Sequence, residues 1–202
     1  QFPAGDLARA ARYFAGESAF VAGDFATALP LFEQVVQNDV KKYLDRSLYR
    51  AGECAGVLKN WSTSQKHYQR LINDFPQFER LHDARYGLAF ALQNQNQFDQ
   101  AIAIYEEVAD QSAGESGAKS RFMLGEIAFA RKEYDEAVFH FGAVSGYGYK
   151  HWQGEAQYEM ARCLVELGKK PQAIAAFEKM QTDFPDHEKT EDAIRLLAEL
   201  RK

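Results

Sequence analysis

The sequence lacks the features of several specialised protein classes. Its two cysteines among 202 residues are too few for a disulfide framework. No apolar run approaches the ~18 residues of a membrane-spanning helix, so we expect no direct membrane insertion. Twenty-four Lys and Arg against 29 Asp and Glu give a net charge of −5. That balance does not supply a cationic surface for phosphates, so we expect no nucleic-acid partner.

Motifs for catalysis and cofactor binding are also missing. The sequence has no phosphate-binding Gly-rich loop, no His-Glu-x-x-His, no Gly-x-Ser-x-Gly and no Cys-x-x-Cys. The five histidines occur singly without ligand-like spacing, which favours solvated or helix-surface positions: His67, His82, His140, His151 and His187. We therefore predict that the chain is not an enzyme and holds no cofactor or metal.

Proline is scarce, and the long stretches between the five prolines are rich in residues that favour helix. Few segments alternate with the period of two that marks a half-buried strand. The composition and pattern predict an all-α protein.

A repeat underlies these helical stretches. A small residue recurs at spacings of 36, 37, 36 and 36 positions, as Ala28, Ser64, Ala101, Ala137 and Ala173. An aromatic residue follows each by four positions: Phe32, Tyr68, Tyr105, Phe141 and Phe177. An aliphatic residue or Met comes three positions later still: Val35, Leu71, Val108, Val144 and Met180. This i, i+4, i+7 pattern is one apolar face of a helix.

A second column lies twelve residues before each small residue. It contains Gly16, Gly52, Ala89, Gly125 and Ala161. Glycine disfavours helix, so its recurrence predicts that two helix backbones approach closely there. Each repeat is therefore expected to be a pair of helices.

These columns resemble the tetratricopeptide repeat family. The aromatics at 25, 61, 98 and 134 and the prolines at 76 and 185 belong to the same likeness, which covers about residues 7–202. The period exceeds the family's usual ~34 residues. Together with the Asp-Phe-Pro endings of segments 71–76 and 180–185, it looks like a subtype common in bacterial cell-envelope proteins.

The resemblance implies a right-handed α-α superhelical solenoid of five helix pairs with a C-terminal capping helix. We expect one array over residues 1–202, with repeats at about 7–38, 45–77, 82–112, 117–145 and 153–187. The final helix, 190–201, is expected to cover the apolar face of the last repeat.

In this family the first helix of each pair lines a concave groove where partners usually bind. Two columns match that wall: Tyr13, Tyr49, Tyr86, Phe122 and Tyr158, and Glu17, Glu53, Phe90, Glu126 and Arg162. We predict that these ten residues bind the partner, as an aromatic ladder edged by carboxylates that suits a peptide or extended ligand with apolar and basic groups. The alternative is that the rings pack between neighbouring first helices. Full burial of Tyr49, Tyr86 and Tyr158 would exclude the ladder.

The family's clamp for the C-terminal carboxylate of chaperones is not matched. At the corresponding positions stand Tyr13, Glu17, Arg50, Asp83 and Gly87. Only Arg50 is cationic, so the resemblance disfavours that ligand.

Two loops depart from the repeat. The segment 146–152 carries three large aromatics, which either form a recognition tip or fill the joint between repeats with Tyr149 and Trp152. The segment Ser112 to Gly117 is expected to be flexible.

The sequence thus predicts a non-catalytic scaffold that binds a protein or peptide partner in its groove. Two alternatives stay open: a groove for a small molecule or envelope polymer, and a regulatory module of a larger enzyme. Self-association is a further expectation to be tested. The resemblance favours the bacterial periplasm or cell envelope, with the cytoplasm left open.

Overall fold

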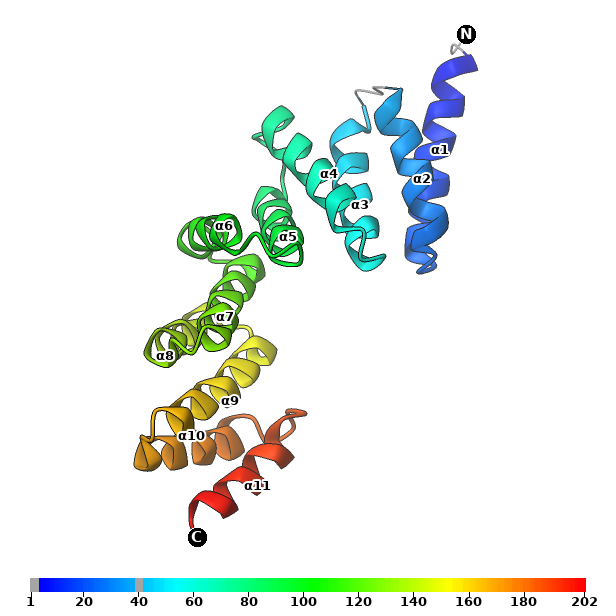
Figure 1. Ribbon diagram of the computed structural model, residues 1–202. Coiled ribbons are helices and arrows are strands. Elements are labelled where there is room, and N and C mark those ends of the chain that lie inside the picture. The colour runs from blue at the N-terminus through cyan, green and yellow to red at the C-terminus, as the bar shows by residue number, and fades with distance from the viewer. Residues whose placement is uncertain (1–3, 39–41) are drawn as a thin grey trace. The chain divides into compact units, whose positions relative to one another are not determined.

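The repeat pattern folds into consecutive helices throughout the part of the chain that the structure describes. The computed structural model describes residues 4–38 and 42–202, so residues 1–3 and 39–41 of the expected array lie outside it. The helices are α1 (Ala4–Val21), α2 (Phe25–Gln37), α3 (Leu44–Val57), α4 (Trp61–Asp74), α5 (Leu81–Gln93), α6 (Phe98–Gln111), α7 (Glu115–Ala130), α8 (Tyr134–Ala143), α9 (Lys150–Glu166), α10 (Lys170–Asp183) and α11 (Thr190–Leu200), with a short 3-10 helix η1 (Val144–Tyr147) after α8 (Figure 1).

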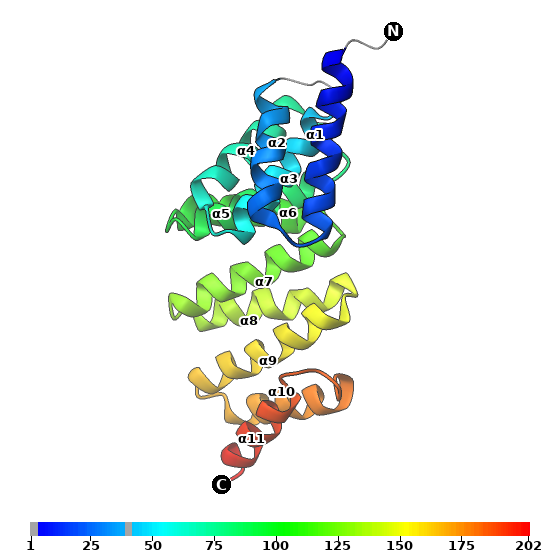
Figure 2. The same ribbon diagram turned by 90° about the vertical axis from the view of Figure 1, so that its right-hand side faces the viewer.

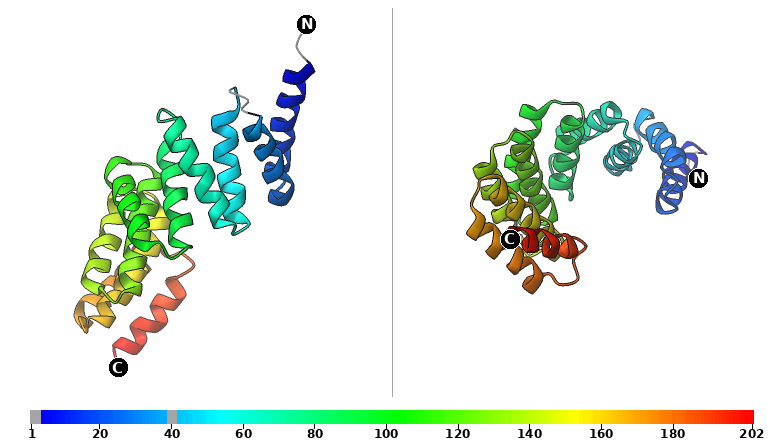
Figure 3. Two further views of the ribbon diagram at one scale, coloured as in Figure 1. Left: turned by 45° about the horizontal axis from the view of Figure 1, so that its top comes forward. Right: turned by 60° about the horizontal axis from the view of Figure 1, so that its bottom comes forward.

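The chain divides into two units, residues 1–104 and 105–202, with the boundary inside α6. In unit 1, α1 packs on α2, α2 on α3, α3 on α4 and α4 on α5 (Figure 3). In unit 2, α7 packs on α8, α8 on α9, α9 on α10 and α10 on α11 (Figure 2). The predicted all-α class of helix pairs followed by a final helix is confirmed.

The turn inside each pair has the same backbone conformation. One residue with positive φ recurs at the repeat period: Gly23, Lys59, Asn96, Lys132 and Gly168. In the second pair, the Lys59 N–H donates to the Gly56 carbonyl at 3.0 Å and the Asn60 N–H to the Ala55 carbonyl at 2.8 Å. These bonds use carbonyls that a helix end leaves without an internal partner, and so end the first helix of the pair.

The predicted columns form the core within each pair. The five aromatics of the small, aromatic and aliphatic pattern are all buried: Phe32, Tyr68, Tyr105, Phe141 and Phe177. A Cβ added to Gly52 would lie 2.8 Å from the Tyr68 ring, and one added to Gly125 would lie 2.7 Å from the Phe141 ring. The Gly column therefore does mark a close approach, but its neighbour is an aromatic ring of the second helix, where we predicted a helix backbone.

The segment from Ser112 to Gly117 is packed, so the expectation of a flexible loop is wrong. Ser112, Ser116 and Gly117 are buried, and the Ser112 Oγ accepts the Gly114 N–H at 3.2 Å. The Tyr147 hydroxyl donates to the Ala109 carbonyl at 2.5 Å, which holds η1 against the end of α6, just before this segment. Small residues were the only sequence signal here, and they serve tight packing.

The aromatic loop 146–152 fills a joint with different residues from those predicted. Trp152 packs on Phe122 with ring centroids 5.4 Å apart, and its indole N–H donates to a Glu115 carboxylate oxygen at 3.1 Å. Tyr147 is the second inserted ring, whereas Tyr149 is 37% exposed. The packing role is confirmed for Trp152 and wrong for Tyr149.

None of the helices in residues 4–38 and 42–202 combines the length and apolar character that crossing a membrane requires.

Candidate functional site

A cavity of about 300 Å³ opens in unit 1 where α1, α3 and the segment joining α4 to α5 meet. Its walls are Tyr13, Glu17, Arg46, Tyr49, Arg50, Phe78, Glu79 and Arg80. Three of these, Tyr13, Glu17 and Tyr49, belong to the predicted partner-binding columns. Residues from two first helices therefore do line a common hollow, together with a connecting segment that no column included.

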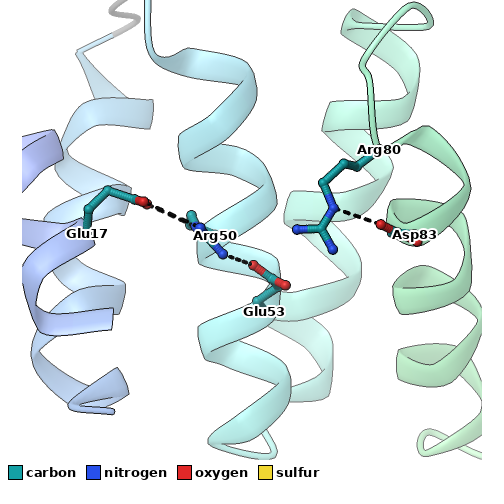
Figure 4. Close-up of polar contacts among 5 residues, drawn as sticks. All are labelled: Glu17, Arg50, Glu53, Arg80 and Asp83. Carbon is teal, nitrogen blue, oxygen red and sulfur yellow. Dashed lines mark hydrogen bonds and ion pairs between the residues drawn. The ribbon is translucent and has the colours of Figure 1, made fainter. Parts of the chain in front are cut away.

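Arg50 is the centre of the polar wall (Figure 4). Its Nε donates to Glu17 on α1 at 3.0 Å, and its Nη1 donates to Glu53 one turn along α3 at 2.9 Å. Burial alone would lower the pKa of Arg50, but these hydrogen bonds outweigh it, so the pKa is raised. Arg50 also lies over the Phe20 ring, 4.2 Å from its centroid. The guanidinium is thus held in place, and it ties α1 to α3.

Arg80 closes the cavity from the other side. Its Nε donates to Asp83 at 2.7 Å, and its guanidinium lies 4.6 Å from the centroid of the Tyr49 ring. In Figure 4 its two terminal nitrogens point away from Asp83, towards α3. A guanidinium carries five N–H donors, so Arg80 keeps donors that face the hollow.

The aromatic column is more buried than a ladder requires. Tyr49 is 5% and Tyr158 8% exposed, and Tyr13 is also buried, whereas Tyr86 and Phe122 are half-buried. Tyr49 packs edge-on against Tyr68, and Tyr158 packs edge-on against Phe177. Burial raises the pKa of Tyr49, with Glu53 adding to it, so the hydroxyl stays protonated. The alternative that the rings are packing residues fits Tyr49 and Tyr158. Exclusion of the ladder required that Tyr86 be fully buried as well, and Tyr86 is only half-buried.

Four cavity residues escaped the prediction from sequence: Phe78, Glu79 and two arginines, Arg46 and Arg80. Arg46 lies one helical turn before Arg50, on the same face of α3, a spacing that could have indicated it. Arg80 precedes α5 and belongs to no repeating column, so nothing in the repeat pattern could have found it. The sequence therefore identified one cation of this wall, and the structure brings three together.

The remaining predicted residues of unit 1 form an aromatic patch. The Tyr86 and Phe90 rings are stacked at 6.2 Å, and the Trp61 ring meets Phe90 edge-on at 5.6 Å. Both Tyr86 and Phe90 are half-buried. Tyr86 and Phe90 thus pack against each other on α5, and Phe90 also packs against Trp61 on α4.

In unit 2 two of the predicted residues, Glu126 and Arg162, lie in an acidic cluster with two glutamates that were not predicted. Glu126 on α7 lies near Glu155 and Glu159 on α9, and Arg162 donates to Glu159 at 2.6 Å. Burial raises the pKa of Glu126, and the Glu159 carboxylate raises it further. Burial likewise raises the pKa of Glu159, although Arg162 opposes this. Carboxylates kept at such positions disfavour folding at neutral pH, which makes them candidates for a binding role.

We expect Glu126→Gln to raise the stability of unit 2 at pH 7. A carboxyl whose pKa is higher in the folded than in the unfolded chain binds more protons when folded, so the free energy of unfolding falls as pH rises between the two values. The loss of stability is absent at pH values below the pKa of this carboxyl in the unfolded chain, and it is complete at pH values above its pKa in the folded chain. The substitution removes the repulsion by Glu159 and Glu155 and also loses the attraction to Arg162, so we expect a gain of about 0.5 kcal/mol at pH 7. Urea denaturation at pH 4 and pH 7 measures it.

The exposed Glu199→Gln is the control, because it makes the same charge change away from the cluster. An equal gain in both variants, or a Glu126→Gln gain that does not shrink at pH 4, would contradict this account.

The prediction for the histidines is wrong at three positions. His67 and His140 are buried, and burial lowers the pKa of each. His187 has a side chain only 8% exposed. The Nε2 of His67 lies 3.2 Å from Glu33 Oε1, and the Nε2 of His140 lies 3.2 Å from Glu136 Oε1. Both histidines are therefore buried polar residues with a carboxylate partner.

The two cysteines are buried and unpaired. Burial raises the pKa of both Cys54 and Cys163 to about 12. Both thiols therefore stay protonated at neutral pH, a state that disfavours nucleophilic or metal-binding chemistry.

Comparison with family models agrees with the columns. Models described as tetratricopeptide repeat match residues 9–34, 46–77, 86–142 and 155–187. A search of curated proteins finds no match.

Solved structures are similar in fold at low sequence identity. YrrB, described as a TPR protein with an unusual peptide-binding site, has a TM-score of 0.66 at 17% identity, over 91% of this chain and 90% of YrrB. The structure of MamA from residue 41 to the end, from Desulfovibrio magneticus RS-1, has a TM-score of 0.73 at 14% identity, over 89% of this chain and 97% of that chain. The C-terminal part of a TPR repeat-containing protein from Cytophaga hutchinsonii has a TM-score of 0.75 at 13% identity, over 86% of this chain and 65% of that chain.

Proposed function

Since this chain belongs to the tetratricopeptide repeat family, we propose that it is a protein-interaction scaffold that binds a peptide segment along its first helices. The unit 1 cavity is the anchor of that surface. The observation that carries the proposal is the convergence of three arginines from two separate segments on one hollow with aromatic walls.

The size of the cavity suits part of a peptide. A volume of about 300 Å³ lies at the lower limit for small-molecule pockets, so it accommodates one or two side chains of a longer ligand. The rings of Tyr13, Tyr49 and Phe78 supply apolar contact, and arginines at the rim supply orientation. An extended segment anchored here would continue over the half-buried Tyr86 and Phe90.

The polar wall of unit 1 favours a ligand that accepts hydrogen bonds. Glu17 and Glu53 are already paired with Arg50, and Asp83 is paired with Arg80, so these carboxylates do not need a basic ligand. The guanidinium donors left over on Arg80, and the exposed Arg46, suit backbone carbonyls or a carboxylate side chain. We therefore replace the basic ligand predicted from sequence by an acidic or carbonyl-rich one for this cavity.

A peptide selection tests the proposal. A phage-displayed library of random peptides is panned on the full chain, and the enriched peptides are synthesised and titrated by fluorescence anisotropy. We expect enrichment of Asp or Glu beside aromatic residues. Arg46→Gln should weaken binding about 10-fold or more, because a hydrogen bond to a charged group contributes about 1.5 to 3 kcal/mol.

Arg195→Gln is the matched control, since Arg195 is an exposed arginine on α11 in the other unit. Equal binding of the selected peptides by wild type and Arg46→Gln would refute the cavity as the anchor. A selection that enriches no binding peptide would refute peptide binding itself. Placement in a bacterial envelope stays a prediction from the resemblance.

A further inference from the structure

Unit 2 brings two histidines and a glutamate together, although the sequence predicted no ligand cluster. His151 and Glu155 lie four residues apart in the first turns of α9, so they share a helix face. His187 comes from the segment between α10 and α11. One ligand atom of each side chain lies within 4.8 Å of the other two. The cluster thus joins two segments that are separated by a whole helix.

The backbone allows this meeting at one residue of α9. A Cβ added to Gly154 would lie 2.5 Å from the His187 ring, so the glycine lets that ring approach the α9 backbone closely. His151 stacks on the same ring, with centroids 5.5 Å apart and planes at 27°. The His187 ring is therefore held between α9 and His151.

The buried nitrogen of His187 points to a ligand. The side chain is more than nine-tenths buried, and its Nε2 has no hydrogen-bond partner among the described residues. That atom lies 3.8 Å from the Glu155 Oε1, too far for a hydrogen bond. A buried nitrogen without a partner costs free energy, which a group bound between it and the carboxylate would remove.

We propose that His151, Glu155 and His187 form a binding site for Zn²⁺ or a divalent transition ion of similar ligand preference. Zinc binds imidazole nitrogen and carboxylate oxygen at about 2.0 to 2.2 Å, so two of its ligand atoms lie within roughly 4 Å of each other. The spacing between Glu155 and His187 already meets this. His151 is exposed, and rotation of its side chain closes the remaining distance.

The donor set decides the kind of ion. Two nitrogens and one oxygen favour zinc, whereas calcium and magnesium prefer oxygen ligands throughout. Glu126 and Glu159 lie near Glu155 and add negative potential that favours a cation. Three protein ligands leave a fourth position for water, on the side of the exposed His151.

One existing contact opposes the ion. The Lys189 N–H donates to the His187 Nδ1 at 3.3 Å, which places the ring proton of the neutral imidazole on Nε2. Metal binding at Nε2 moves that proton to Nδ1 and gives up this long hydrogen bond. Two further ligands outweigh the loss, and the ion then ties the start of α9 to the segment that leads into α11.

Calorimetric titration of the metal-stripped full chain with Zn²⁺ tests the site. We expect one equivalent to bind and the melting temperature to rise, because the ion binds the folded chain in preference. His151→Ala and Glu155→Gln should each lower the affinity by at least about 100-fold, more than the loss of an outer-shell partner usually costs. Glu188→Gln, an exposed carboxylate next to His187, is the matched control and should bind as wild type.

Cobalt provides a readout independent of affinity. Co²⁺ bound by two imidazoles and a carboxylate should show visible d–d absorption that His151→Ala abolishes. Circular dichroism checks that each variant is folded. Because His151 is exposed, we expect His151→Ala to fold as the wild type does. Binding of less than one Zn²⁺ by the wild type, displacement of Zn²⁺ by excess Mg²⁺, or unchanged binding in both ligand variants would each overturn the proposal.

Discussion

Gly117→Ala is expected to unfold unit 2 at a much lower denaturant concentration than wild type. A Cβ at this position would lie 2.0 Å from the Ser112 carbonyl oxygen and 2.6 Å from the Tyr147 ring. The carbonyl is backbone, so it cannot rotate away as a side-chain end would. We expect a loss of about 3 kcal/mol or more, at the upper end of the range for overpacked sites.

Trp152 fluorescence during urea denaturation, in a Trp61→Phe background, measures this change in unit 2, because Trp61 and Trp152 are the two tryptophans of the chain. Gly146→Ala is the control: nothing lies within 4 Å of a Cβ there, and the change should stay within about 0.5 kcal/mol. A Gly117→Ala protein as stable as Gly146→Ala would mean that the segment is loose after all.

Phe141→Ala should cost unit 2 about 3 to 5 kcal/mol, the usual range for deleting a buried phenylalanine ring. Phe141 is 1% exposed and packs on Gly125 and on the Phe122 ring, with centroids 5.3 Å apart. Its removal leaves a cavity in the cluster that includes Val144 and Ala156. The same fluorescence-detected denaturation measures the loss.

Phe139→Ala supplies a control on the same helix and with the same residue type. Phe139 lies two positions earlier and is 60% exposed, so its loss should change stability by no more than about 0.5 kcal/mol. Similar losses for the two variants would contradict the assignment of Phe141 to the repeat core.

The repeating columns predicted the fold because a helix pair must bury the same positions in every copy. Phe141 was assigned to the core from its spacing to Ala137 and Val144, and Phe139 fell outside the columns. The turn chemistry also follows the period, since the residue with positive φ recurs from Gly23 to Gly168. Local periodicity of this kind depends on contacts within a pair, and the sequence records them directly.

The candidate site was predicted only in part. Tyr13, Glu17 and Tyr49 were named from their columns, and they do line the unit 1 cavity. Their burial, and the pairing of Glu17 with Arg50, depend on where α1 and α3 meet, which no column records. Arg80 comes from the segment between α4 and α5, which lies outside the repeating columns.

The sequence by itself determined the all-helical pairs, their period and the apolar face of each helix, because these follow from the order of residues within one repeat. Tertiary structure decided which polar groups meet. Gly117 became intolerant of a side chain because the chain folds back at Ser112 and the Tyr147 ring packs there. His187 reached His151 and Glu155 only when segments on either side of α10 packed together. Such meetings depend on distances in space, and a one-dimensional pattern of residue types does not contain them.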